Sequence, residues 1–391
     1  MSEERDVAVV LSGGSVNGVL MEIGFLRCVR ESSLWPRVGW IFGTSAGALA
    51  GTLAALDRLD ELERFMLALK PEETFRPNRL WRLPLLGTHE YALPETVRER
   101  FGDLEQVARE LAVCDRELVV CATDVTDTSG SDDDPVDYEL VYSSHSTPPA
   151  EFAQAILASA AISALVLPLR VGERIATDGS WTRNFPLAHA YSRPEVETIV
   201  AFRYIPRFPP VEATALAKLR RRLERFGRVP PVRAFIAELR EAEERDRRGE
   251  PPHMVDMIRR LMRVAVMRNT VLEERSADEK DESIRELARL RAETTRLVRA
   301  HVSDPLERER AARAVDEQFA AARFPFGGDR LIPRITVRAA VGEVSLEPSF
   351  RRQKPWTQEA KQSLIERGYT LTARELNAAG FNLPEPRAAE I

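Results

Sequence analysis

The sequence predicts an α/β protein with parallel strands, and two strand–turn–helix units predict it. Residues 7–11 are a continuous aliphatic run without polar alternation, which is typical of a strand buried on both faces of a parallel sheet. A glycine-rich turn at 12–18 follows, and residues 19–29 have the pattern of a helix. A second apolar strand, at 40–42, leads through a serine-containing turn into a small-residue helix at 46–56.

The turn of the second unit has the pattern G-x-S-x-G, with Ser45 between Gly43 and Gly47. In a nucleophile elbow the glycines give the backbone room to hold a serine in a strained conformation, with its hydroxyl exposed at the end of the strand. The pattern is common, and it also occurs in tight packing turns. Ser45 is the candidate nucleophile because the flanking strand and helix supply the context that the motif needs.

The turn of the first unit carries Gly13, Gly14 and Ser15 directly after a strand. Backbone N–H groups of such a turn, with the dipole of the following helix, can stabilise a developing oxyanion. The alternative is a phosphate-binding turn. The sequence argues against that alternative, because no Gly-Lys-Ser/Thr follows as a P-loop requires and the spacing is not G-x-G-x-x-G.

A third element is Asp178-Gly179-Ser180, which follows the segment 171–177 and precedes Asn184-Phe185-Pro186. An Asp-Gly pair alone usually marks a turn. Taken together, the three elements resemble the patatin-like phospholipase family. That family has a G-G-G-x-R/K-G loop, a G-x-S-x-G nucleophile and a D-G-G/A aspartate in this order.

Further segments extend the resemblance over roughly residues 5–205. Residues 119–124 are similar to the central strand of the family, residues 158–163 to its A-S-x-A-x-P segment, and Asn184–Pro186 to its N-x-P element. A weaker similarity returns at Phe350 and at 364–369, which resemble the last strand exit and the closing helix.

The resemblance implies a doubly wound, mostly parallel sheet and a serine-dependent acyl hydrolase acting on lipid esters, with no metal or cofactor. Ser45 would be the nucleophile and Asp178 the general base. The N–H groups of Gly13, Gly14 and Ser15 would form the oxyanion hole, and the supporting residues would be Asn17, Gly18, Gly43, Gly47 and Gly179. An ordinary aspartate, with a pKa of about 3.9, is a weak base, so this role requires burial or hydrogen bonds that favour its neutral form.

The chain departs from the family pattern at Ser15, where a glycine is usual, and at Asn17, where a basic residue is usual. Ser180 replaces the last residue of D-G-G/A, a milder change. Ser15 keeps a backbone N–H, whereas Asn17 replaces only the hydrogen bonding of a cation. These departures leave a second hypothesis open, a catalytically weakened protein that binds lipid or a protein partner.

A histidine triad is a further alternative, because His189 follows Asp178 in the order that α/β-hydrolases use. His189 lies in a segment that we expect to form a helix leading away from the aspartate turn. The other histidines are scattered among polar residues, and no two have metal-ligand spacing. We therefore expect a Ser–Asp dyad.

Composition excludes several other classes. With a net charge of −5 the chain is not a dedicated nucleic-acid binder, and its three cysteines favour buried thiols in a reducing compartment. The first six residues lack the apolar core of a signal peptide, so we expect a cytoplasmic protein. Residues 38–56 carry no charge and approach the length of a membrane span, but the strand–elbow–helix prediction explains them better.

The domain organisation follows from a change of character after residue 205. We predict a catalytic core over 5–205, a charge-rich helical insertion over 206–330 that shapes the acyl pocket, a return to the core over 331–380, and a disordered tail over 381–391. Residues 254–265 have an apolar face and a basic face, which indicates either packing on the core or peripheral contact with anionic lipid. The acidic run 132–134 is expected to be a solvated loop rather than a calcium site. The oligomeric state is not predicted.

Overall fold

The computed structural model describes residues 5–78, 87–126, 138–163, 165–206, 220–221, 223–248, 254–321, 330–340, 346 and 356–381. Within α11 and α12, named below, several side chains between residues 242 and 263 are also outside the description. The acidic run 132–134, Phe350 and residues 382–391 of the expected tail lie outside these residues.

A mostly parallel sheet forms the centre of the fold, as predicted. In the described residues it has eight strands, and seven of them follow the order β10-β9-β1-β2-β5-β8-β7, while β6 pairs with β5. The first five of that order are parallel, and β6, β7 and β8 are antiparallel to their neighbours. The strands are β1 (Val7–Leu11), β2 (Val38–Thr44), β5 (Glu117–Asp124), β6 (Glu139–Ser143), β7 (Leu169–Val171), β8 (Arg174–Asp178), β9 (Thr198–Ile205) and β10 (Arg334–Ala340).

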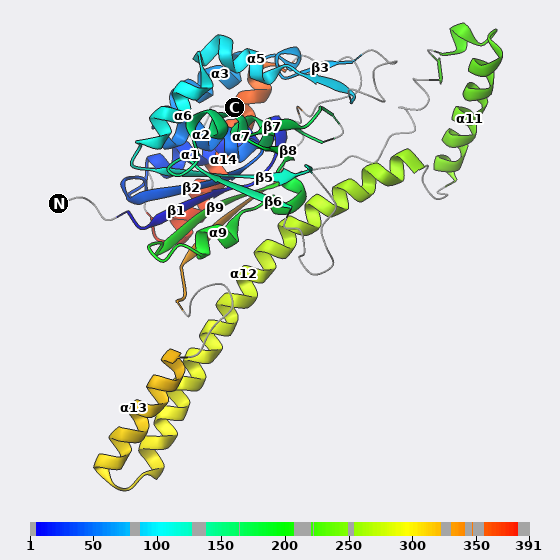
Figure 1. Cartoon of the computed structure of the whole chain (residues 1–391). Helices are drawn as coiled ribbons and strands as arrows, with labels where there is room; N and C mark the ends of the chain where they lie inside the picture. The colour runs from blue at the N-terminus through cyan, green and yellow to red at the C-terminus, as the bar shows by residue number, and fades with distance from the viewer. Residues whose placement is uncertain are drawn as a thin grey trace. The chain divides into compact units, whose positions relative to one another are not determined.

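Helices cover both faces of the sheet (Figure 1). One face carries α1 (Ser15–Arg30), α2 (Ala46–Ala55), α7 (Pro149–Ser159) and α14 (Gln358–Ala378), and the other carries α8 (Ser180–Arg183) and α9 (Leu187–Tyr191). Because side chains of a strand alternate between faces, Val9 of β1 joins the first core and Val10 joins the second. Burial on both faces explains why β1 is an uninterrupted apolar run.

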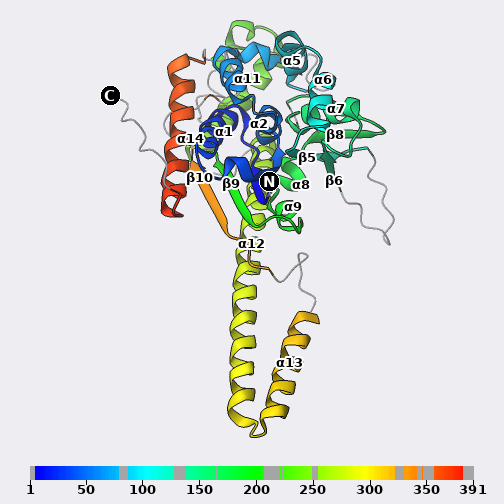
Figure 2. The same cartoon turned by 90° about the vertical axis from the view of Figure 1, so that its left-hand side faces the viewer.

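The helix α14 lies along α1 beside the edge strand β10, as Figure 2 shows. Two glycines make this close contact possible. A Cβ at Gly24 would collide with the carbonyl of Ile365, and a Cβ at Gly368 would collide with the carbonyl of Met21. The last helix therefore packs on the first one at backbone distance.

Smaller elements lie near the carboxyl ends of β1 and β2. They are α3 (Leu59–Ala68), α5 (Leu93–Phe101), α6 (Leu104–Ala112) and the hairpin of β3 (Phe75–Pro77) and β4 (His89–Tyr91). Three short 3-10 helices, η1 (Trp35–Arg37), η2 (Pro71–Glu73) and η4 (Glu224–Phe226), complete the described elements of this size.

The segment after β9 is helical, with α11 (Pro230–Arg247), α12 (Met254–His301) and α13 (Pro305–Ala321). The chain divides into two compact units, one of residues 206–268 and one of residues 1–205 with 269–391. In the second unit the end of α12 pairs with α13, where Arg291 donates to Asp316 at 2.7 Å (Figure 1). None of the described helices combines the length and apolar character needed to cross a bilayer.

Candidate active site

Ser45 lies at the junction of β2 and α2 in a backbone conformation that non-glycine residues rarely adopt. Its φ of 54° and ψ of −112° place it in a strained turn. The flanking glycines make the turn possible. A Cβ at Gly43 would strike the backbone of Gly47, and a Cβ at Gly47 would strike Leu11 of β1. The G-x-S-x-G stretch thus has the geometry of an elbow, with its serine at the carboxyl end of a strand.

Asp178 is the last residue of β8, and its carboxylate faces Ser45. The Ser45 hydroxyl donates to Oδ2 of Asp178 at 2.7 Å, and the two residues are only 5% and 4% exposed. Strand β5 brings them together, because Thr44 pairs with Cys121 and Asp178 with the adjacent Ala122. Two residues 133 positions apart in the chain therefore share one buried hydrogen bond.

The environment of Asp178 raises its pKa above the ordinary value of an aspartate. Burial is the largest cause, and hydrogen bonds from Ser180 and Ser45 oppose it. One of these bonds runs from the Ser180 backbone N–H to Oδ1 of Asp178 at 2.8 Å. A buried carboxylate that is held by hydrogen bonds yet destabilised by desolvation is a stronger base than an exposed aspartate.

Of the three backbone N–H groups expected to form the oxyanion hole, that of Gly13 already donates a hydrogen bond within the protein. The N–H of Gly13 is engaged, because it donates to the backbone carbonyl of Asn184 at 2.9 Å. The N–H groups of Gly14 and Ser15 have no hydrogen-bond partner among the described residues. Ser15 has a φ of 53°, so its side chain is accommodated in a conformation that favours glycine. Gly14 and Ser15, rather than Gly13, are thus the available donors.

Asn17 and Gly18 are not loop residues, because α1 already begins at Ser15. Asn17 is fully buried. Its amide donates to the Tyr204 hydroxyl at 3.3 Å and its carbonyl oxygen accepts from the N–H of Leu346 at 2.8 Å. Asn17 is thus engaged in hydrogen bonds within the fold, and its supporting role at the oxyanion loop stays a prediction. Its hydrogen bonds connect α1 to β9 and to the segment before α14.

An apolar pocket with an empty volume of about 880 Å³ opens beside Ser45 and Ser15. Aliphatic and aromatic side chains form nearly all of its described wall, and most of them come from α1, α2, α3, α5, α6 and α7. They include Val19, Leu49, Leu53, Leu62, Phe65, Met66, Leu69, Phe75, Leu93, Val97, Phe101, Leu104, Val107, Ile156 and Leu157. Its described lining residues lie between residues 15 and 162, and a part of the helical insertion in shaping the acyl pocket stays a prediction.

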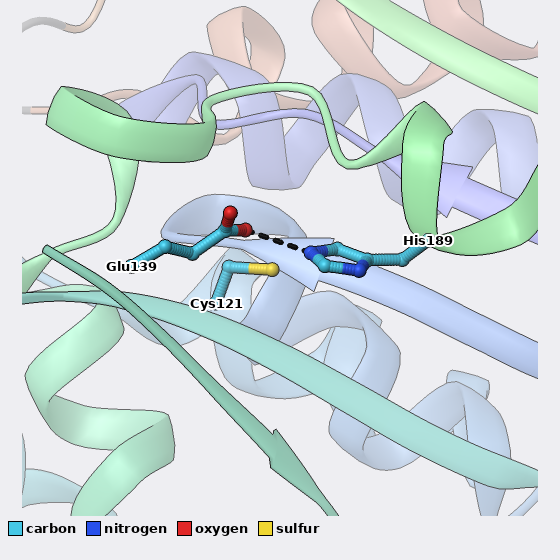
Figure 3. A group of neighbouring side chains, drawn as sticks. All are labelled: Cys121, Glu139 and His189. Atoms are coloured by element: carbon cyan, nitrogen blue, oxygen red, sulfur yellow. Dashed lines mark hydrogen bonds and ion pairs between the residues drawn. The ribbon is translucent and has the colours of Figure 1, made fainter. Parts of the chain in front are cut away.

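His189 is occupied elsewhere, in a group with Glu139 and Cys121 (Figure 3). Its Nε2 lies 2.7 Å from Oε1 of Glu139, and Arg183 binds both oxygens of the same carboxylate at 2.9 and 2.7 Å. Burial raises the pKa of Glu139, but the bonds from His189 and Arg183 outweigh it and hold the pKa at about 2. The contacts of His189 thus give no support to a triad through Asp178.

The ligand atoms of Cys121, Glu139 and His189 lie within 4.8 Å of one another, a separation that a metal ion could bridge. The guanidinium of Arg183 already neutralises the carboxylate, and burial raises the pKa of the Cys121 thiol, so that the thiolate a metal prefers is disfavoured. The donor set therefore fits an ion-pair network better than a metal centre.

Ser159 and Asn184 contact the site but received no individual role in the sequence analysis. The Ser159 hydroxyl accepts the N–H of Ser45, and the carbonyl of Asn184 accepts the N–H of Gly13. The signal for both was their position in segments similar to A-S-x-A-x-P and N-x-P. Only the structure shows that their partners are backbone groups of the site.

The fold and the site are those of an α/β protein with a serine at a strand-to-helix elbow, as in serine acyl hydrolases. Residues 9–191 form a domain that matches the model of the patatin-like phospholipase family. This match supports a lipid acyl hydrolase in general terms.

Among solved structures, the crystal structure of VipD from Legionella pneumophila is similar, with 14% identity and a TM-score of 0.41. The match covers 96% of this chain and 67% of that one. No curated protein sequence matches the chain significantly.

Proposed function

We propose that the protein is a serine-dependent lipid acyl hydrolase of the phospholipase A, lysophospholipase or carboxylesterase type. The observation that carries this proposal is the 2.7 Å hydrogen bond from Ser45 to Asp178 next to an apolar pocket. Nucleophile and base are within the distance that proton transfer requires. The pocket supplies a dry surface for an acyl chain.

In the first half-reaction the Ser45 Oγ attacks the ester carbonyl carbon while its proton moves to Oδ2 of Asp178. A tetrahedral intermediate forms, and its oxyanion lies near the N–H groups of Gly14 and Ser15 at the start of α1, which donate to no other described residue. The dipole of α1 adds to their effect, because its positive end faces the same place. Collapse of the intermediate breaks the ester bond, and the alcohol leaves with the proton that Asp178 holds.

In the second half-reaction water attacks the acyl-Ser45 ester. Asp178 accepts the proton of the water, and the same donors stabilise the second oxyanion. Collapse releases the fatty acid and returns the proton to the Ser45 Oγ. One ester and one water thus give one acid and one alcohol, with no cofactor needed.

The pocket supports an acyl chain as the part of the substrate that the protein binds. Its described wall consists largely of aliphatic and aromatic side chains, and each buried methylene contributes about 0.8 kcal/mol to binding.

The test compares the purified protein with its Ser45→Ala variant by lipid profiling and by hydrolysis of short acyl esters. We expect turnover by the wild type and none by the variant, because only the hydroxyl is removed. Full turnover by Ser45→Ala would contradict the proposal. If neither protein hydrolyses any ester and Ser45 does not react with an organophosphonate, the lipid-binding or partner-binding hypothesis is the better one.

A further inference from the structure

Ser159 is a fully buried serine at the end of α7, and its hydroxyl connects two backbone groups at the centre of the site. Its Oγ accepts the N–H of Ser45 at 2.9 Å and donates to the carbonyl oxygen of Cys121 at 2.6 Å. The nucleophile is therefore linked to β5 by a side chain from another element.

The carbonyl of Cys121 is the point where the elbow and the aspartate turn meet. Ser159 binds this oxygen from the side of Ser45, and Gly179 lies so close to it that a Cβ there would collide. In the sheet, Cys121 pairs with Thr44 and the next residue pairs with Asp178. The Ser159 bridge thus binds β5 at Cys121, next to the two residue pairs that set the distance between Ser45 and Asp178.

The strained conformation of Ser45 makes this bridge important. A non-glycine residue at φ 54° persists only where its surroundings hold it. The buried N–H of Ser45 would lose its partner if the Ser159 hydroxyl were removed, and the turn could then relax toward a commoner conformation.

We propose that Ser159 is a positioning residue, which holds the backbone of Ser45 so that its hydroxyl stays on Asp178. The proposal rests on the proposed function, since it assigns to Ser159 a part in that reaction. The described hydrogen bonds of the Ser159 hydroxyl go to the Ser45 N–H and the Cys121 carbonyl, so its effect acts through the placement of Ser45.

Ser144, directly after β6, provides a matched control that binds the same strand β5. Its hydroxyl is also buried and accepts a backbone N–H, that of Leu118 in β5, at 3.0 Å. Leu118 lies three residues before Cys121 and belongs to neither the elbow nor the aspartate turn. Ser144→Ala therefore removes the same kind of bond without touching the site.

The experiment measures kcat and KM for a soluble acyl ester, the rate of organophosphonate labelling, and the melting temperature of each variant. For Ser159→Ala we expect kcat and the labelling rate to fall about tenfold or more with KM within twofold, because small misplacements of a nucleophile are costly. Ser144→Ala should lower the melting temperature comparably and keep kcat within twofold. Equal kcat in both variants would overturn the proposal.

A further variant, Ser159→Cys, and a measurement of hydrogen–deuterium exchange test the same proposal in other ways. Ser159→Cys keeps a weak donor and acceptor and should give a kcat between those of Ser159→Ala and the wild type; a value no better than alanine's, in a folded protein, would count against the bridge. Hydrogen–deuterium exchange needs no activity. Exchange over residues 42–49 should accelerate in the Ser159 variants alone, and unchanged exchange there overturns the proposal even if the wild type proves inactive, which would refute the proposed function separately.

Discussion

Ser45 has two energetically unfavourable features that a purely structural serine would not require. Its φ is positive, and its hydroxyl is buried against a carboxylate whose pKa burial raises. Strain and desolvation of this kind persist where the surrounding structure holds them, and they cluster at functional sites. The resemblance to the family named both residues from the sequence, and the hydrogen bond between them shows that they lie side by side.

Asp178→Asn should lower kcat by several orders of magnitude, because an amide cannot accept the proton of Ser45. His189→Ala should change kcat little, since the His189 ring bonds Glu139. Steady-state kinetics on one soluble ester compares the two variants. An inactive His189→Ala together with an active Asp178→Asn would require a different base.

The raised pKa of Asp178 also predicts a pH-dependent stability difference. The folded state binds the proton of this carboxyl more tightly than the unfolded chain does, so stability falls as pH rises from the unfolded pKa to the folded one. Asp178→Asn removes this cost. Its melting temperature should exceed that of the wild type at pH 8, and the difference should shrink in acid. If Asp178→Asn were less stable than the wild type at pH 8, the predicted direction of the stability difference would be wrong.

Position 17 shows where the motif could not be transferred from sequence alone. The family pattern suggested that Asn17 stands for a lost cation, but it is a buried bridge between α1, Tyr204 and Leu346. A pattern gives the residue type at a position and not what lies opposite it, and those partners are more than 180 residues away.

Asn17→Arg should therefore destabilise the protein rather than restore activity. The position is fully buried, and a guanidinium there would lose its hydration without a described carboxylate in contact. We expect a loss of about 3 kcal/mol or more in the free energy of unfolding. Urea denaturation measures it. The control is Ser15→Gly, which relieves a positive φ and should leave the protein folded.

At the scale of elements, the strands and helices of the first half followed from apolar runs and glycine turns. The prediction of β1, β2 and α2 depended on local patterns, and the structure confirms them within a few residues. The apolar pocket beside Ser45 could not be predicted in this way. Its described wall combines residues of six helices whose contacts are non-local, and sequence order did not single out α3, α5 and α6 as part of it.

The pocket assignment predicts the effect of a larger side chain at Leu53, which lines the pocket from α2 and is 5% exposed. Leu53→Trp should lower kcat/KM for a dodecanoyl ester by about tenfold or more relative to a butanoyl ester. The added ring fills space that the longer chain needs, and each excluded methylene loses about 0.8 kcal/mol. The short ester controls for damage to the catalytic pair. An unchanged ratio of the two esters would place the acyl chain elsewhere.

At the scale of the whole molecule, segments far apart in the chain support the site within one compact unit. Residues after 268 of α12 contact the turn that follows Asp178. Thr270 accepts from the Asn184 amide at 2.7 Å, and Glu273 pairs with Arg183. Asn184 in turn accepts the N–H of Gly13. The start of this α12 segment is therefore connected to both the aspartate turn and the oxyanion loop.

Reaction of the full chain with an organophosphonate tests whether Ser45, activated by Asp178, is the nucleophile of a lipid acyl hydrolase. Peptide mass spectrometry locates the adduct. We expect one adduct on Ser45, formed much more slowly in Asp178→Asn and absent in Ser45→Ala. An adduct on another residue, or undiminished labelling of Ser45→Ala, would contradict it.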